Sequence, residues 1–458
     1  MRILHLTNLF CGLVCVVAVG CADNNSQSIR GVAGEGGFAA AGGTAYTSGS
    51  GGRANVGAGG AADKAGGGGR ANAGSGASTS EAGTITTGSG GTTQSGTVLP
   101  KAGNPDGSCS QSLPPEAQPA DASKPTTVVG TGTAESCTYD KLASAVAKAG
   151  VITFNCGTEP VSIRVTATLE LKTDTNTVID GGNKVTLDGG SSVRILKWQA
   201  GDWMVNNNAL ILQHIVLANG KATGTEAIPT RPAPCSQGFN DGQGGALFMR
   251  DGVLRAIDVT FIKNEAALLG PDTGGGALYL LGVKAAYIAS CSFLNNRASN
   301  AGGMGSLFAN NFIYNSLFDG NEATGHGANN ADSSKCSYKN NNQNEVGSGG
   351  NGGAIYNDGA EGASITICGT QIRNNHANAF GSALFYTSND DSGSLTIRDS
   401  HFFENKQCLD WWEVQPGISM SESVYNDKNM INSVFDKPSN WSSKNDPVCA
   451  PYIAEYSD

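Results

Sequence analysis

Charged residues are scarce in this 458-residue chain, at 15% of its composition, and no basic run occurs in it. The formal net charge is −10 at pH 7. Nucleic acids and anionic lipid surfaces attract clustered Lys and Arg, so this composition disfavours both as partners. Histidine is also rare, with five residues, and no two cysteines have the C-x-x-C spacing common in metal sites. The sequence therefore predicts neither nucleic-acid binding nor a metal site.

Long apolar segments are missing as well. The run from Leu9 to Val19 contains Gly12 and is too short to span a bilayer. It leads into Ala18-Val19-Gly20-Cys21, which resembles a bacterial lipoprotein signal with its cleavage box. The resemblance implies a signal peptide at 1–20, acyl chains on Cys21, and a lipid anchor in the bacterial outer membrane or at the cell surface. An ordinary secretory peptide, cut after a small residue, is the alternative.

Glycine is abundant by contrast, with 65 residues divided between an N-terminal tract and a set of repeats. Residues 21–104 are mostly Gly, Ala, Ser and Thr, and they contain almost nothing to bury. This composition is typical of a flexible tether, whose typical end-to-end distance at this length is about 50 Å. Such a tether would lift a folded domain off a membrane surface.

A two-part phrase recurs five times between Gly244 and Asn405. Its first part is Gly-Gly-Ala or a close variant, which occurs at Gly244-Gly245-Ala246, Gly275-Gly276-Ala277, Gly302-Gly303-Met304, Gly352-Gly353-Ala354 and Gly381-Ser382-Ala383. Its second part is an apolar residue with Asn three positions later, as in Phe261/Asn264, Phe293/Asn296, Phe318/Asn321, Ile372/Asn375 and Phe402/Asn405. Repetition on a scale of about 25 to 30 residues indicates stacked units that bury their faces against one another.

Short strands fill the repeats. Period-2 segments rich in β-branched and aromatic residues lie between the two parts of the phrase, as at 277–281, 286–289 and 364–367. No segment inside the repeats keeps helical spacing for three turns, which argues against leucine-rich and paired-helix arrays. Strands stacked ~4.8 Å apart place equivalent residues above one another. The pattern therefore predicts an aromatic stack of Phe261, Phe293, Phe318 and Phe402. It also predicts a ladder at a bend, made by Asn264, Asn296, Asn321, Asn375 and Asn405.

The pairing of Gly275-Gly276-Ala277-Leu278 with Phe293-Leu294-Asn295-Asn296 carries a family resemblance. It resembles the repeats of chlamydial polymorphic outer-membrane proteins and of right-handed β-helix repeat proteins in the pectin-lyase-like superfamily. The resemblance implies an all-β fold, a right-handed parallel β-helix of about ten coils. It implies little about activity, because such scaffolds carry lyases, hydrolases, adhesins and passive surface proteins.

The folded domain is expected at 105–458. Residues 139–150 place apolar residues at helical spacing before a terminal glycine, which predicts a short helix capping the first coil. Strand signals follow at 151–154, 161–163, 177–182, 185–190 and 210–220. Two insertions interrupt the coils, near 221–243 and 324–351, and long loops on a rigid scaffold are either binding elements or disordered decoration.

Nine cysteines remain besides Cys21 after removal of the signal, an odd number for an exported protein, in which disulfides persist. Their positions suggest three bridges, Cys137 with Cys156, Cys235 with Cys336, and Cys408 with Cys449. Cys291 and Cys368 lie inside strand patterns and are expected to be buried as small apolar residues.

Catalytic phrases are incomplete. Pectate-lyase-like chemistry needs acidic residues that hold Ca²⁺ and a basic residue that abstracts a proton, and the W-I-D-H and R-x-P-x-x-R phrases are missing. Polygalacturonase-like hydrolysis needs clustered aspartates. His326 between two glycines, with Asp390 and Asp391, resembles those motifs in reversed order. Asp251, Asp358, Asp390 and Asp391 follow the glycine strands and would line one face as a cation or sugar site, or simply face solvent in turns.

Two functional hypotheses remain open. The first is a non-catalytic, lipid-anchored adhesin or envelope scaffold without a cofactor, whose partner is a polysaccharide or a surface protein. The second is a polysaccharide lyase or glycoside hydrolase acting on acidic polysaccharide, with Ca²⁺ required only in the lyase case. Five tryptophans offer stacking surfaces for sugars, namely Trp198, Trp203, Trp411, Trp412 and Trp441. Those near the ends of the solenoid would instead cap its core.

Overall fold

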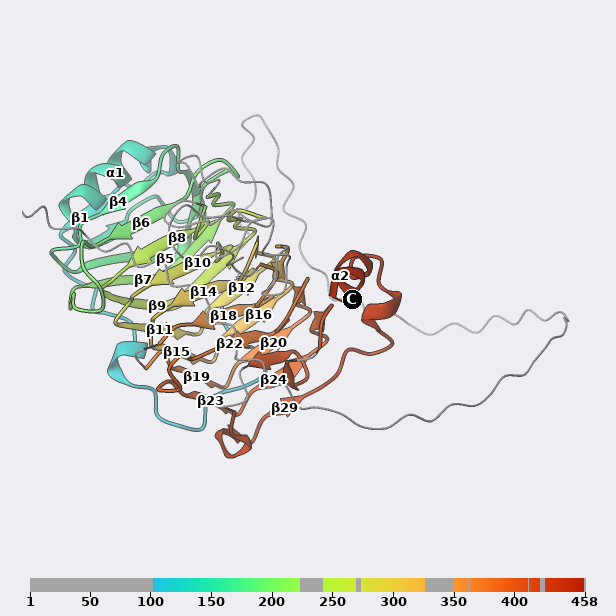
Figure 1. Ribbon diagram of the computed structural model, residues 1–458. Coiled ribbons are helices and arrows are strands. Elements are labelled where there is room, and N and C mark those ends of the chain that lie inside the picture. The colour runs from blue at the N-terminus through green and yellow to red at the C-terminus, as the bar shows by residue number, and fades with distance from the viewer. Residues whose placement is uncertain are drawn as a thin grey trace, which may run out of the picture. The chain divides into compact units, whose positions relative to one another are not determined.

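The computed structural model describes residues 102–222, 242–268, 273–325, 349–360, 362–410, 412–420 and 425–456. In these ranges the chain is mostly strand, and the strands form three sheets with 16, nine and four strands (Figure 1). All named pairings are parallel except that of the last hairpin. The described part of the chain contains no helix that is both long enough and apolar enough to cross a bilayer.

The 16-stranded sheet, called here the long sheet, consists of β1 (Thr127–Val129), β2 (Gly150–Phe154), β3 (Val161–Arg164), β5 (Thr177–Asp188), β7 (Ala209–Ala218), β9 (Val253–Ile262), β11 (Ala285–Ala289), β12 (Ser292–Leu294), β15 (Asn311–Tyr314), β16 (Leu317–Asp319), β19 (Ile365–Cys368), β20 (Gln371–Arg373), β23 (Leu395–Arg398), β24 (His401–Phe403), β28 (Met430–Ile431) and β29 (Val434–Phe435).

The nine-stranded sheet consists of β4 (Leu169–Leu171), β6 (Leu196–Gln199), β8 (Leu247–Arg250), β10 (Leu278–Leu281), β14 (Met304–Leu307), β18 (Ile355–Asp358), β22 (Leu384–Tyr386), β27 (Ile418–Met420) and β26 (Glu413–Gln415). The four-stranded sheet consists of β13 (Arg297–Ala298), β17 (Glu322–Ala323), β21 (His376–Ala377) and β25 (Lys406–Gln407). The helical elements are α1 (Tyr139–Lys148), α2 (Ala450–Tyr456) and the short 3-10 turns η1 (Pro115–Ala117), η2 (Ala134–Ser136), η5 (Asp427–Asn429) and η6 (Ser443–Asn445).

Successive coils contribute strands in the same order: one to the nine-stranded sheet, then one long or two short strands to the long sheet, and in four coils one more to the four-stranded sheet. This repetition makes the described region an all-β parallel solenoid. Equivalent residues stand in columns. Leu247, Leu278 and Met304 are direct neighbours across β8, β10 and β14, and the column continues through Ile355 and Leu384. All five are fully buried. The solenoid therefore encloses one continuous apolar core.

The glycine phrase is offset by one residue in one copy. The register pairs Met304 with Leu278, so it is Ala301-Gly302-Gly303, and not Gly302-Gly303-Met304, that matches Gly275-Gly276-Ala277. The buried column decides this register, because a one-residue slip would turn Met304 away from the core. Ala301 consequently occupies the left-handed position, at φ 53°, that glycine fills in the other copies.

The aromatic stack is shorter than the sequence predicts. Phe261 stacks on Phe293 with ring centroids 4.8 Å apart, and Phe293 stacks on Phe318 at 4.4 Å. The next residue in the column is Ile372, which separates Phe318 from Phe402. Phe402 therefore does not join the stack of three.

Five buried asparagines, Asn264, Asn296, Asn321, Asn375 and Asn405, are hydrogen bonded in series. In each successive pair, the side-chain Nδ2 of one residue donates to Oδ1 of the next at 2.9–3.0 Å. The backbone N–H of the same donor residue reaches the same oxygen at 2.9–3.1 Å. Each Nδ2 also donates to a backbone carbonyl of the preceding coil at 2.8–3.2 Å. The ladder thus satisfies both side-chain and backbone polar groups at this buried bend.

A second ladder, made of hydroxyl groups, was not expected. Ser316, Thr370, Ser400 and Ser433 each accept a hydrogen bond from a backbone N–H of the preceding coil at 3.1–3.3 Å. Each hydroxyl donates to the carbonyl two residues earlier at 2.7–3.2 Å. Cys291 occupies the first position of this column and is fully buried as a free thiol, as predicted. Burial raises the pKa of the Cys291 thiol to about 12.

Helix α1 lies where the sequence predicts a cap. Thr138 accepts a hydrogen bond from the backbone of Lys141 at its start, and Leu142, Ala145 and Val146 are buried. The helix contacts β1 and β4, the first strands of the long and nine-stranded sheets (Figure 1). It therefore covers apolar groups at the N-terminal end of the core, which no preceding coil would cover.

Three disulfides connect described cysteines. Cys137–Cys156 and Cys408–Cys449 confirm two predicted pairs, whereas Cys235 and Cys336 lie outside the described residues. Cys368 is buried, as predicted, but it is not simply a small apolar residue, because it is bonded to Cys109. Its side chain packs in the apolar cluster under the N-terminal segment and not in the main core.

That segment, residues 102–121, is called here the N-terminal strap. Its first half hydrogen bonds to one corner of successive coils, from Ala102 at Asp258 to Ser110 at Asp399. Its second half runs back to β7, where Ala120 N donates to Gln213. Ala102, Gly103 and Asn104, which the sequence assigns to the tether, already hydrogen bond to the solenoid. Leu113 and Ala117 pack on Ile257, Ala289 and Tyr314 of the long sheet.

Candidate functional site

An acidic turn site follows two neighbouring strands, β18 and β22, and involves Asp358, Asn389 and Asp390. Asp358 ends β18 and is 6% exposed. Its Oδ2 accepts a hydrogen bond from the hydroxyl of Tyr356 at 2.8 Å, and its Oδ1 accepts one from Asn389 Nδ2 at 3.1 Å. Tyr356 in turn stacks on Phe385 of the next coil, with centroids 5.1 Å apart. Stacked strands thus hold the carboxylate in place.

Burial dominates the electrostatics of Asp358. It raises the pKa of this carboxyl group above the ordinary value, and hydrogen bonds from Tyr356, Gly359 and Asn389 only partly offset the effect. A carboxyl group that retains its proton at higher pH is able to act as a proton donor. Of the predicted acidic residues, Asp358 is the one whose environment favours such chemistry.

Asp390 and Asp391 lie in the exposed turn after β22. Asp390 Oδ1 accepts hydrogen bonds from Ser392 Oγ at 2.7 Å, Ser392 N at 3.1 Å and Ser388 Oγ at 3.2 Å. Asp391 adopts a left-handed backbone conformation at φ 57°, and its N–H donates to the carbonyl of Ser388. Both residues therefore help to shape the turn. Asp390 follows Asn389, whose side chain donates to Asp358.

Asp251 does not join this site and is not a solvent-facing turn residue. It is fully buried, and both its oxygens accept hydrogen bonds from the N–H of Asn206, at 3.0 and 3.1 Å. Its carboxylate therefore fixes the loop before β7. The four predicted aspartates consequently divide into one structural anchor, two members of the acidic turn site, Asp358 and Asp390, and Asp391, which shapes the same turn.

Two tryptophans expected as sugar platforms are used in packing. Trp198 is fully buried in β6, and Trp203 packs edge-on against Phe308 at 5.1 Å. Near the C-terminus, Trp412 packs on Phe380 and Trp441 donates to Asp446. His326, Trp411, Cys21 and most of both insertions lie outside the described residues.

Within the described ranges, two groups of potential metal ligands come together. His376 lies near Cys408 and Cys449, and Asp399 lies near Cys109 and Cys368. In both groups the two sulfur atoms are joined in a disulfide, so they do not offer the thiolates that a metal would bind. Neither group carries a metal-site hypothesis.

One polar cluster, around Asp180, lines a hollow and was not predicted from the sequence. Asp180 lines a hollow of about 370 Å³ together with Phe154 and Ser123. Its Oδ1 lies 3.1 Å from Nδ1 of His214, and its Oδ2 accepts from Gln213 Nε2 at 2.8 Å. Asp180 and His214 are 34 residues apart in the sequence, so no local motif links them.

Comparison of the chain with protein-family models, with curated proteins and with solved structures finds no match.

Proposed function

We propose that this protein is a lipid-anchored surface rod that acts without catalysis as an adhesin or envelope scaffold. In this proposal the solenoid is a right-handed parallel β-helix of about ten coils, of the kind that the repeats resemble. Cys21 carries the acyl chains in the bacterial outer membrane or at the cell surface, and residues 21–101 form the tether. A polysaccharide or a surface protein is the partner.

The unbroken amide ladder is the observation that supports a rod. It joins five successive coils through buried hydrogen bonds, and the hydroxyl ladder runs beside it. Such continuous coil-to-coil bonding makes the lateral faces rigid, which suits the presentation of a long binding surface. The exposed Asp390 is engaged by its own turn, which favours a structural use of this residue.

Binding without cleavage is the expected result for the full-length protein on a panel of acidic and neutral polysaccharides, with and without Ca²⁺. Binding would be measured by co-sedimentation, and cleavage by the release of reducing ends and unsaturated products. Cleavage that is lost in both Asp358→Asn and Asp390→Asn would refute the non-catalytic proposal. In the native host, Cys21→Ala is expected to move the protein from the membrane fraction to the soluble fraction.

A polysaccharide hydrolase is the second candidate, and the raised pKa of Asp358 favours it. A protonated Asp358 would supply the acid that cleavage of a glycosidic bond requires, and Asp390 would supply the second carboxylate. The raised pKa of Asp358, which the proton-donor role requires, is testable without knowing the substrate.

We expect Asp358→Asn to gain stability relative to the parent protein as the pH rises from 4 to 7. Because the folded-state pKa of Asp358 is raised, the stability that its protonated form contributes is present at low pH and is lost as the pH rises through that value. Asparagine does not ionise, so the variant avoids this loss. Urea midpoints at the two pH values would measure the change, with exposed Asp390→Asn as the control. A loss of stability of Asp358→Asn relative to the parent between pH 4 and pH 7 would contradict the raised pKa, and with it the proton-donor role.

A further inference from the structure

The N-terminal strap runs across the coils instead of along them. Its N–H groups and side chains reach a column of corner residues in which the backbone is left-handed, at φ 47–63°, namely Asp258, Ser290, Asn315, Gly369 and Asp399. Five successive coils are therefore joined by one segment that belongs to none of them.

The first half of the strap fits this corner closely. Ala102 N donates to Asp258 Oδ1 at 3.3 Å, and Gly103 N donates to Ser292 Oγ at 2.8 Å. Asn104 N donates to the carbonyl of Asn315 at 2.9 Å. A Cβ atom on Gly103 would lie 2.8 Å from that same carbonyl oxygen, so only glycine allows the approach.

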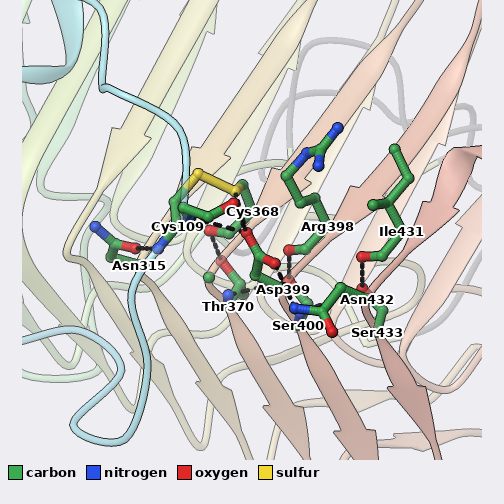
Figure 2. The surroundings of a disulfide bond; sticks show 12 residues. Cys109, Asn315, Cys368, Thr370, Arg398, Asp399, Ser400, Ile431, Asn432 and Ser433 are labelled. Carbon is green, nitrogen blue, oxygen red and sulfur yellow. Dashed lines mark hydrogen bonds between the residues drawn. A yellow bond between two sulfur atoms is a disulfide. The ribbon is translucent and has the colours of Figure 1, made fainter.

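Beyond these bonds the strap is fixed covalently. The Cys109–Cys368 disulfide joins residues 259 apart in sequence. Cys109 N donates to Asn315 Oδ1 at 2.6 Å, and the backbone N–H and hydroxyl of Ser110 both donate to Asp399 Oδ2, at 2.9 and 2.5 Å. Figure 2 shows this disulfide beside Asp399 and the hydroxyl ladder at Thr370, Ser400 and Ser433.

We propose that the N-terminal strap is a mechanical clasp that transfers tension from the preceding chain into the coil of β19, through the Cys109–Cys368 disulfide. Residues 110–367 lie within the loop that this disulfide closes, so no tension passes along their backbone once the hydrogen bonds of the strap have broken. The hydrogen bonds of residues 102–104 would peel one after another under load, because each joins the strap to a different coil. The disulfide then stops the peeling. The biological use of the clasp rests on the proposed tethering, whereas its mechanics do not.

Asp399 protects the clasp in this proposal. Its Oδ2 lies 3.8 Å from Cys368 Sγ, and hydrogen bonds, first from the Ser110 hydroxyl and then from Asn432, keep the pKa of the Asp399 carboxyl group low. A thiol reductant attacks as the thiolate anion, with oxidation of two of its thiols to a disulfide and reduction of the clasp to two thiols. The adjacent carboxylate repels that anion.

Force spectroscopy on the full-length protein, pulled between handles at its two ends, tests the load path. With the disulfide intact, the extension should exclude residues 110–367. In Cys109→Ser/Cys368→Ser the extension should increase by several hundred ångströms, at up to ~3.4 Å per released residue. Cys137→Ser/Cys156→Ser is the matched control, because that bridge closes a loop of separation 19 inside the protected region and its removal should leave the extension unchanged. Equal extensions in the parent and the clasp variant would overturn the proposal.

A second measurement covers the case in which the double variant does not fold. The parent protein and the Cys137→Ser/Cys156→Ser control would be pulled before and after treatment with a small dithiol. Both should lengthen by several hundred ångströms, well beyond the ~140 Å that opening the Cys408–Cys449 loop, of separation 41, adds at up to ~3.4 Å per residue. Asp399→Asn, which removes the charge and keeps the size, should be reduced roughly fivefold faster than the parent. An unchanged rate of reduction would refute the protective role of Asp399. Polysaccharide binding enters neither experiment, so failure of the clasp and failure of the adhesin proposal are distinguishable.

Discussion

Replacing Gly276 by Ala should destabilise the solenoid by about 4 kcal/mol or more. A Cβ atom at this position would lie 2.2 Å from the carbonyl oxygen of Gly302 in the next coil, and 2.6 and 2.7 Å from the backbone N and O of Arg297. All three contacts are backbone atoms, which cannot rotate away as a side chain would. Relief therefore requires neighbouring coils to separate, and separation breaks the hydrogen bonds between them.

Urea unfolding followed by circular dichroism would measure this loss. Gly201→Ala is the matched control, because Gly201 is exposed, has no left-handed backbone, and would place its Cβ with nothing inside 4 Å. That control should change stability by less than ~0.5 kcal/mol. If Gly276→Ala unfolded at the same urea concentration as the parent, coil spacing would be more adaptable than the contacts indicate.

The same geometry explains which parts of the fold were predictable from sequence. Gly220, Gly245, Gly276, Gly302 and Gly353 form one column, and a Cβ on each would meet a carbonyl oxygen of the next coil at 2.2–2.5 Å. Each of these coils therefore requires glycine at this position, and the requirement appears in the sequence as a regularly repeated phrase. The buried asparagines repeat for the same reason.

Features that do not repeat with the coils were missed or misjudged. The one-residue offset at Ala301 arose because the sequence there reads Ala-Gly-Gly-Met, and only the burial of Met304 distinguishes the two alignments. The strap and its disulfide depend on residues 259 apart, for which no local pattern exists. Cys368 accordingly appeared to be an ordinary strand residue.

The hydroxyl ladder did leave a signal. The dipeptides Asn315-Ser316, Gly369-Thr370, Asp399-Ser400 and Asn432-Ser433 recur at one corner, each two residues before an apolar core position. A small polar residue or glycine tolerates the left-handed backbone, and the following hydroxyl then reaches the neighbouring coil. Aligning the repeats on this corner, in addition to the glycine phrase, would have revealed the ladder from sequence.

The acidic turn site was predictable only in part. The positions of Asp358 and Asp390 after successive strands indicated that they would lie near each other. Their different environments depend on cross-coil partners, because Asp358 is held by Tyr356 and Asn389, whereas Asp390 is held by serines of its own turn. Residue type and spacing do not encode that difference.

Replacing Asn321 by Ala should cost roughly 3–5 kcal/mol, the second largest expected effect. Asn321 is fully buried at the middle of the ladder. Its removal leaves Asn296 without the oxygen that accepts two of its N–H groups, at 3.0 and 3.1 Å. It also leaves Asn375 Oδ1 and the carbonyl of Phe293 without the donor that reaches each at 2.9 Å. Asn207→Ala is the control, because Asn207 is exposed and lies outside the ladder.

Asn321→Asp separates lost hydrogen bonds from lost volume, because the two side chains are almost the same size. The carboxylate keeps an acceptor for Asn296, but it places a second, charged oxygen where Nδ2 donates to Asn375 and Phe293. A buried carboxylate facing acceptors costs at least as much as the missing side chain, so at pH 7 the urea midpoint should fall no less than in Asn321→Ala. The midpoint should recover partly toward pH 4, where protonation of the carboxyl group restores a donor. If Asn321→Asp were instead as stable as the parent at pH 7, the direction of donation along the ladder would not contribute to stability.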